Sequence, residues 1–190
     1  MMFRMLPCLA LLLTLLGVAV PASAQTYVCM ETTKGNFCMQ MLPQDAPNTV
    51  TNFLKYVDDG DYTDSLVHRA VKNFVIQGGG FYLRNAVLGD PVPTDPPVLN
   101  EFKRSNLRGT VAMARQSGAV NSATSQWYVN LVDNIGLDSI DGGFTVFAEI
   151  VSGMNVVDKI AGFRIADISA SFGSNFTSIP LDISATATTI

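Results

Sequence analysis

Two stretches of the chain, residues 67–79 and 108–130, combine hydrogen-bonding side chains with aromatic and aliphatic ones. The first carries Arg69, whose guanidinium has N–H donors and no acceptor. The amides of Gln77 and Gln126 stand among apolar residues, where each needs a hydrogen-bond partner. Taken one by one, these residues have plainer interpretations, such as a surface ion pair for Arg69 and core packing for the aromatic residues. Taken together, they could donate hydrogen bonds to a group held in an apolar pocket.

The sequence lacks the machinery of other common reactions. The glycine run at residues 78–80 has neither the GxGxxG spacing nor the GKS/T ending of a phosphate-binding loop, and no GxSxG elbow presents a serine nucleophile. His68 is the single histidine and the cysteines are not spaced as CxxC, so no metal site is expected. A net charge of -4 argues against nucleic acid as a partner, because phosphate binding needs a dense basic surface.

The two stretches closely resemble the cyclophilin family of peptidyl-prolyl cis-trans isomerases. Residues 67–79 read VHRAVKNFVIQGG against the family pattern F-H-R-x(4)-F-x-x-Q-G-G, with Val67 in place of the usual phenylalanine. Residues 108–115 read RGTVAMAR and residues 122–130 read SATSQWYVN, similar to the family's G-T-x-x-M-A and S-Q-F-F segments. The likeness covers nearly the whole chain after residue 24 and has the character of exported bacterial members. It implies an enzyme that uses no cofactor and acts on proline-containing segments of unfolded or flexible exported proteins.

The resemblance implies a role for each matching position. Arg69 matches the catalytic arginine, and Gln77 matches a glutamine that holds the substrate backbone and supports that arginine. His68 is expected to be a structural histidine beside the site. The other positions that match substrate-binding residues are Phe74 at the pocket floor, Val75 in place of a usual methionine, Ala114 and Arg115 beside the residues before proline, the polar lining residue Gln126, Tyr128 in place of a phenylalanine, Leu137 at the pocket wall and Phe144 in place of a histidine.

Rotation about an X–Pro bond suits these residue types. Resonance holds the amide planar with a barrier of roughly 18–20 kcal/mol, and uncatalysed rotation takes about 10–100 s. Resonance is lost in the twisted transition state, so the proline nitrogen regains a lone pair to which Arg69 can donate. An apolar cup can hold the proline ring at the same time. Interactions that are stronger in the twisted state than in the planar states accelerate the reaction without a covalent step.

Short strands and two short helices must position these residues. Alternation predicts strands over residues 66–77, 109–114, 126–131, 144–151 and 181–186 after a first hairpin over 27–41, and the glycines at 78–80 are expected to end one of them. One helix is predicted after a cap at Asn48 or Thr49, and another begins near Gly153. Trp127 is expected to face the core, opposite Tyr128. This pattern predicts a closed β-barrel, and the resemblance implies a mainly β, eight-stranded antiparallel barrel with two short capping helices.

Residues 1–24 have the features of a secretory signal peptide. A single charge, Arg4, precedes an apolar run over residues 9–20, and a small-residue cleavage site follows at residues 22–24. A membrane anchor is the alternative, but the run is shorter than the roughly 20 residues that a spanning helix needs. We therefore expect a cleaved signal peptide over 1–24 and one isomerase domain over 25–190. The mature protein is expected to be a monomer in the periplasm or outside the cell, without stable membrane insertion.

Cys29 and Cys38 remain after this cleavage and flank a turn signal at residues 34–36. A hairpin would bring the two cysteines onto neighbouring strands, and export would place them in an oxidising compartment. A Cys29–Cys38 disulfide is therefore expected. Two free thiols, or cysteines on opposite faces of the sheet, are the alternatives, because a one-residue slip of register turns a side chain to the other face.

Departures from the family pattern lie at the edge of the pocket. Gly136 falls where many members carry an aromatic residue, often the tryptophan that contacts cyclosporin, so weak cyclosporin binding is expected. The altered edge leaves two other interpretations open: a binding module or chaperone with little catalysis, and a structural domain of the cell envelope. The intact arginine, phenylalanine and glutamine positions favour an isomerase that assists the folding of exported proteins.

Overall fold

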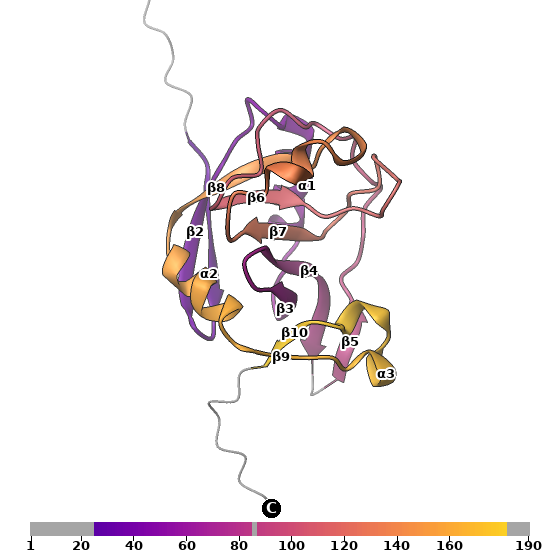
Figure 1. Ribbon diagram of the computed structural model, residues 1–190. Helices are drawn as coiled ribbons and strands as arrows, with labels where there is room; N and C mark the ends of the chain where they lie inside the picture. The colour runs from indigo at the N-terminus through magenta and orange to yellow at the C-terminus, as the bar shows by residue number, and fades with distance from the viewer. Residues whose placement is uncertain (1–24, 85–86, 182–190) are drawn as a thin grey trace, which may run out of the picture.

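The protein is described by a computed structural model over residues 25–84 and 87–181 (Figure 1). The expected signal peptide at 1–24 therefore lies outside the described residues. The main sheet has eight strands in the order β1-β2-β8-β6-β7-β4-β3, with β5 paired to β4, and every pairing within it is antiparallel. Its strands are β1 (Tyr27–Thr32), β2 (Gly35–Met41), β3 (Ser65–Val71), β4 (Val75–Arg84), β5 (Val87–Pro91), β6 (Thr110–Met113), β7 (Trp127–Asn130) and β8 (Val146–Ser152). The predicted mainly β, antiparallel architecture is confirmed.

Helices and a small second sheet complete the described chain. The α-helices are α1 (Pro47–Asp58), α2 (Met154–Ala161) and the four-residue α3 (Ser169–Phe172), so α3 is a helix that the sequence analysis does not predict. The 3-10 helices are η1 (Ile135–Asp138), η2 (Ile140–Gly142) and η3 (Ser174–Phe176), and the second sheet pairs β9 (Arg164–Ala166) with β10 (Ile179–Leu181). None of the described helices is both long and apolar enough to cross a membrane.

The barrel is not closed, contrary to the expectation. β1 and β3, at the two ends of the strand order, do not pair with each other within the described ranges. A mainly apolar groove of about 910 Å³ is lined by residues of both strands. The segment before β10 meets the edge of β3 instead, where the Ala70 N–H donates to the Ser178 carbonyl at 2.8 Å. The predicted last strand over 181–186 is described only at Leu181.

The main hydrophobic core forms where one face of the sheet packs against α1 and α2. β2 alternates buried side chains with more exposed ones, as the two-residue period of a strand requires. The ring of Phe53 on α1 lies 4.9 Å from the ring of Phe147 on β8, centroid to centroid. Trp127 belongs to this core, whereas Tyr128 lies in a second cluster, so the expected division between these neighbours is confirmed.

A distant side chain caps α1. The helix begins at Pro47, and neither Asn48 nor Thr49 caps it with its own side chain as predicted. The Glu101 carboxylate accepts the N–H of Asn48 at 3.1 Å and the N–H of Thr49 at 2.8 Å instead. A negative charge at this end of a helix also complements the helix dipole. The cap therefore depends on contact between separate parts of the chain.

β4 continues through residues 78–80, where the sequence analysis predicts an end. An added Cβ at Gly78 would lie 2.9 Å from the Trp127 ring, and one at Gly80 would lie 2.8 Å from the Gln126 amide. Glycine in a strand often marks such a close approach between neighbouring elements. These glycines therefore let β4 lie directly against β7 and the residues that precede it.

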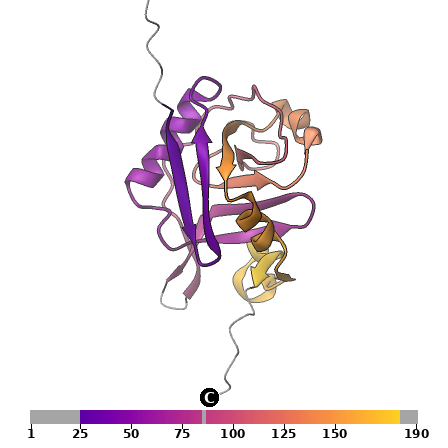
Figure 2. The same cartoon turned by 90° about the vertical axis from the view of Figure 1, so that its left-hand side faces the viewer.

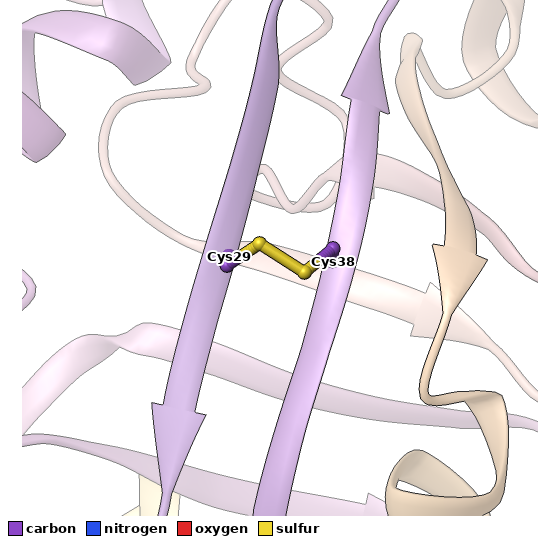
Figure 3. The surroundings of a disulfide bond; sticks show 2 residues. All are labelled: Cys29 and Cys38. Atoms are coloured by element: carbon purple, nitrogen blue, oxygen red, sulfur yellow. A yellow bond between two sulfur atoms is a disulfide. The ribbon is translucent and has the colours of Figure 1, made fainter.

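The hairpin of β1 and β2 holds both cysteines. Cys29 and Cys38 are direct partners in the strand register, and a disulfide joins their sulfur atoms (Figure 3). Figure 2 shows this long hairpin at the front of the molecule. The free-thiol and opposite-face alternatives do not describe this structure.

Replacing Cys29 and Cys38 together by serine is expected to lower the free energy of unfolding by about 2 kcal/mol. A disulfide restricts the unfolded chain, and a link across a roughly 15-residue loop is worth about 3 kcal/mol, with a shorter loop worth less. The separation here is nine residues. Urea denaturation would compare the oxidised protein, the reduced protein and the double variant. The stabilities of the reduced protein and the double variant should agree, and equal stability of all three proteins would show that the bond does not stabilise the fold.

Candidate active site

Neighbouring strands bring the predicted arginine and glutamines together. Arg69 on β3 is the register partner of Gln77 on β4, and Gln77 in turn is the partner of Tyr128 on β7. Arg69 Nη1 donates to Gln77 Oε1 at 3.4 Å, and Gln77 Nε2 donates to Gln126 Oε1 at 2.8 Å. This chain of side chains holds the guanidinium from one side and leaves its other N–H groups for a ligand.

Arg69 lies beside apolar surface and not in an ion pair. Its guanidinium carbon is 5.9 Å from the centre of the Phe74 ring. Burial lowers the pKa of Arg69, but an arginine remains charged at neutral pH. Among the described residues, no carboxylate lies within salt-bridge distance of it. The surface ion pair considered for Arg69 is therefore absent from the described structure.

The apolar residues of the predicted pocket form one cluster, separate from the main core. Tyr128 and Val75 are buried in it, and the more exposed members lie against them. The Tyr128 and Phe144 rings meet edge to face with 6.0 Å between their centres. The predicted residues that the structure places in this cluster are Phe74, Val75, Ala114, Tyr128, Leu137 and Phe144. We call these six residues the cup, and Phe74 joins them to Arg69.

Arg115 takes a different place from the other predicted site residues. Only 3% of its side chain is exposed, and its guanidinium carbon lies 4.2 Å from the centre of the Phe144 ring. Its Nη2 donates to the carbonyls of Ile140 at 3.0 Å and Asp141 at 3.3 Å. The guanidinium therefore braces Phe144 and η2. Substrate contact by Arg115 stays a prediction.

The sequence analysis misses a buried polar network beneath the cup. Tyr128 Oη donates to Asn106 Oδ1 at 2.8 Å, and burial raises the pKa of this hydroxyl, so it stays protonated. Asn106 Nδ2 donates to Asp138 Oδ1 at 2.9 Å. Burial raises the pKa of Asp138, but hydrogen bonds from Asn106 and Ser105 outweigh that effect and keep the pKa below its ordinary value. The one signal in the sequence is the extra hydroxyl of Tyr128, because a buried tyrosine usually finds a partner.

His68 has the position of a structural residue. It lies next to Arg69 on β3, at the point where the register between β3 and β4 shifts. It is 2% exposed and its ring meets that of Phe81 edge to face, 5.0 Å between centres. Burial lowers the pKa of His68 to about 4, so the ring is neutral at neutral pH.

Replacing Gly80 by alanine is expected to lower kcat/KM about three- to tenfold, the worth of a hydrogen bond of roughly 0.5–1.5 kcal/mol. The new methyl group would displace the Gln126 amide, 2.8 Å away, and break its bond to Gln77. Gly162→Ala is the control, since its added Cβ makes only 3.4 Å contacts at the end of α2. Assays of the isomerase activity that the resemblance implies would test this on both variants, and an equal effect would remove Gln126 from the mechanism.

Comparison with known proteins gives a consistent result. The family described as cyclophilin type peptidyl-prolyl cis-trans isomerase/CLD matches residues 27–178. Peptidyl-prolyl cis-trans isomerase A of Dickeya dadantii is 41% identical over 160 residues, which are 82% of each chain. Peptidyl-prolyl cis-trans isomerase B of Escherichia coli is 42% identical over 146 residues, 71% of this chain and 84% of that protein. A cyclophilin type isomerase of Cryptosporidium parvum shares the fold with a TM-score of 0.67 at 18% identity, over 84% of this chain and 92% of that one.

Proposed function

The chain belongs to the cyclophilin-type peptidyl-prolyl cis-trans isomerases. From this premise we propose that it accelerates the cis-trans isomerisation of X–Pro bonds in exported proteins, with Arg69 as its catalytic residue. The family activity requires no cofactor, and its substrates are proline-containing peptide segments. The observation that carries the residue assignment is the position of Arg69, free of a carboxylate partner within the described structure, between Gln77 and the apolar cup.

Arg69 acts in this proposal on the twisted amide. The proline ring enters the cup, where Phe74, Tyr128 and Leu137 surround it. As the X–Pro bond twists, the proline nitrogen gains a lone pair, and a guanidinium N–H donates to it. Gln77 keeps the guanidinium in place, so no reorganisation is needed at the moment of rotation. The gain exists only in the twisted state, which is the condition for acceleration.

Residues on either side of the cup contact the peptide chain before proline. Gln77 and Gln126 hold the substrate backbone, and Ala114 and Arg115 lie beside the residues that precede proline. Phe144 forms the edge of the cup, where it meets Tyr128. An assay of cis-to-trans exchange in a short X–Pro peptide tests the whole assignment, and the absence of acceleration by the native protein would contradict it.

The proposal that the protein is exported is supported by two features of the chain. The basic residue, apolar run and small-residue site of residues 1–24 fit a signal peptide. The Cys29–Cys38 disulfide fits an oxidising compartment. Fractionation of cells that express the full chain, followed by N-terminal sequencing, should find a soluble exported protein that begins at Gln25. A full-length protein in the membrane fraction would contradict this proposal.

Weak inhibition by cyclosporin is expected because Gly136 offers no side chain at the pocket edge. Gly136 lies in η1, and an added Cβ there would meet nothing within 4 Å. Gly136→Trp should therefore be accommodated and should strengthen inhibition about tenfold, the effect of roughly 1.4 kcal/mol of new contact. Inhibition assays on the native protein and this variant would measure the change. Tight inhibition of the native protein would show that the missing aromatic residue is unimportant.

A further inference from the structure

The side chain of Asn106 is the centre of the polar network beneath the pocket. It is fully buried in the segment between β5 and β6. Its Oδ1 accepts from Tyr128 Oη at 2.8 Å and from Asn130 Nδ2 at 3.2 Å. Its Nδ2 donates to Asp138 Oδ1 at 2.9 Å and to the Phe144 carbonyl at 3.2 Å. An amide side chain has two acceptor sites and two donor hydrogens, so its whole capacity is used.

These bonds reach two sides of the pocket. Tyr128 on β7 forms the floor together with Phe74. The bonds donated by Nδ2 reach the segment 134–144, which we call the wall segment. The wall segment contains Leu137 and ends at Phe144, which also belongs to the cup. Asn106 also holds the first residue of the wall segment, because the Asn134 N–H donates to the Asn106 backbone carbonyl at 2.8 Å. One residue therefore joins the floor to both ends of the wall.

The wall segment has little packing of its own to hold it. It consists mostly of the short turns η1 and η2, in which no residue is buried. Ile135 and Ile140 are 65% and 47% exposed. Segments with few buried apolar contacts have low local stability. Its position therefore depends on side chains from outside. Arg115 and Asn100 donate to carbonyls at residues 140–143, and Asn106 lies beneath.

We propose that Asn106 is a positioning residue that sets the separation between the floor and the wall of the proline pocket. The inference rests on the isomerase function proposed above, because it assigns the cup to the proline ring. The proline ring is held in both the planar and the twisted states of the substrate. Loss of the wall should therefore weaken substrate binding more than it slows rotation of the X–Pro bond. It should also reduce the preference for a five-membered ring over a larger one.

Two variants separate the bonds of Asn106. Asn106→Asp keeps the volume and the oxygen that accepts from Tyr128 and Asn130, but in its ionised form it loses both donors to the wall segment and repels the Asp138 carboxylate. Tyr128→Phe keeps the ring and loses only the bond from the floor. Tyr56→Phe is the matched control, because it removes the hydroxyl of another buried tyrosine. Tyr56 lies on α1, outside the cup, and its hydroxyl accepts the Asp95 N–H at 2.8 Å.

The test measures kcat and KM for an X–Pro peptide and for the same peptide with the six-membered ring of pipecolic acid. Activities are normalised to the folded fraction from circular dichroism. Asn106→Asp should raise KM about fivefold, change kcat less than about twofold, and lower the preference for proline about threefold, because uniform binding is lost. Tyr128→Phe should shift the ring preference in the same direction by about twofold, and Tyr56→Phe should match the native protein.

A folded Asn106→Asp variant with native KM and native ring preference would overturn the proposal. If that variant does not fold, native ring preference in Tyr128→Phe would overturn it equally. Equal effects in Tyr56→Phe and Asn106→Asp would also contradict it, since they would reflect general destabilisation. If the proposed isomerase function were wrong, the native protein would accelerate isomerisation of neither peptide, and this result is distinct from all of the outcomes above.

Discussion

Replacing Arg69 by alanine is expected to lower kcat/KM for an X–Pro peptide by about 100- to 1,000-fold, the usual cost of removing one preorganised donor to a developing charge or lone pair. The guanidinium is half-buried beside Phe74 and supported by Gln77, so neither water nor a neighbour replaces it. The loss should fall mainly on kcat, because the bond to the proline nitrogen forms only in the twisted state. The peptide assay used for the native protein measures it directly.

Arg69→Lys is the informative control for this result. It retains the positive charge but loses the planar fork of donors, so its activity should lie between the native protein and the alanine variant. Thermal unfolding should show both variants folded at the assay temperature, since Arg69 makes no ion pair with a described residue. Activity of the alanine variant within tenfold of native would exclude Arg69 as the main catalytic group.

Acidification from pH 7 to pH 4 is expected to remove about 3 kcal/mol of stability through His68 alone. Burial lowers the pKa of His68 to about 4, against an ordinary value of 6.5. Between these pH values the unfolded chain takes up a proton that the folded protein does not, so unfolding becomes easier as pH falls. Each unit of difference corresponds to about 1.4 kcal/mol. Above pH 6.5 both states are neutral and the effect vanishes.

Comparison with His68→Gln isolates this contribution. Carboxylates with lowered pKa values, such as Asp138 and Glu101, also lose stabilising bonds in acid, and they do so in both proteins. Urea denaturation at a series of pH values should therefore show a steeper fall for the native protein between pH 6.5 and 4. Parallel curves would mean that His68 is protonated without cost and is not buried as the structure shows.

Local patterns in the sequence suffice for several parts of this fold. The alternation over 27–41 identifies the hairpin that carries the disulfide, and the helix predicted after Asn48 or Thr49 is α1. Alternation also separates Trp127 from Tyr128. These features depend on the period of a strand or helix, which is a property of consecutive residues. The motif spacing likewise suffices for the family, because the matched residues come in one order along the chain.

Contacts between distant segments were decided only in the folded chain. Glu101 caps α1, and residues 78–80 continue a strand because they pass close to Trp127. The ends of the sheet stay apart in the described residues, so the eight strands do not close. No local pattern specifies which loop side chain meets which helix end, or which strand edge finds a partner.

The active site divides in the same way. The sequence by itself determined the residue types of the cup, Arg69 and the glutamines, because these stand in motifs of fixed spacing. Only the tertiary structure decided that Arg115 braces Phe144 and that Asn106 joins floor to wall. Such roles arise where loops far apart in sequence are brought within hydrogen-bond distance, and that distance depends on the packing of the whole sheet.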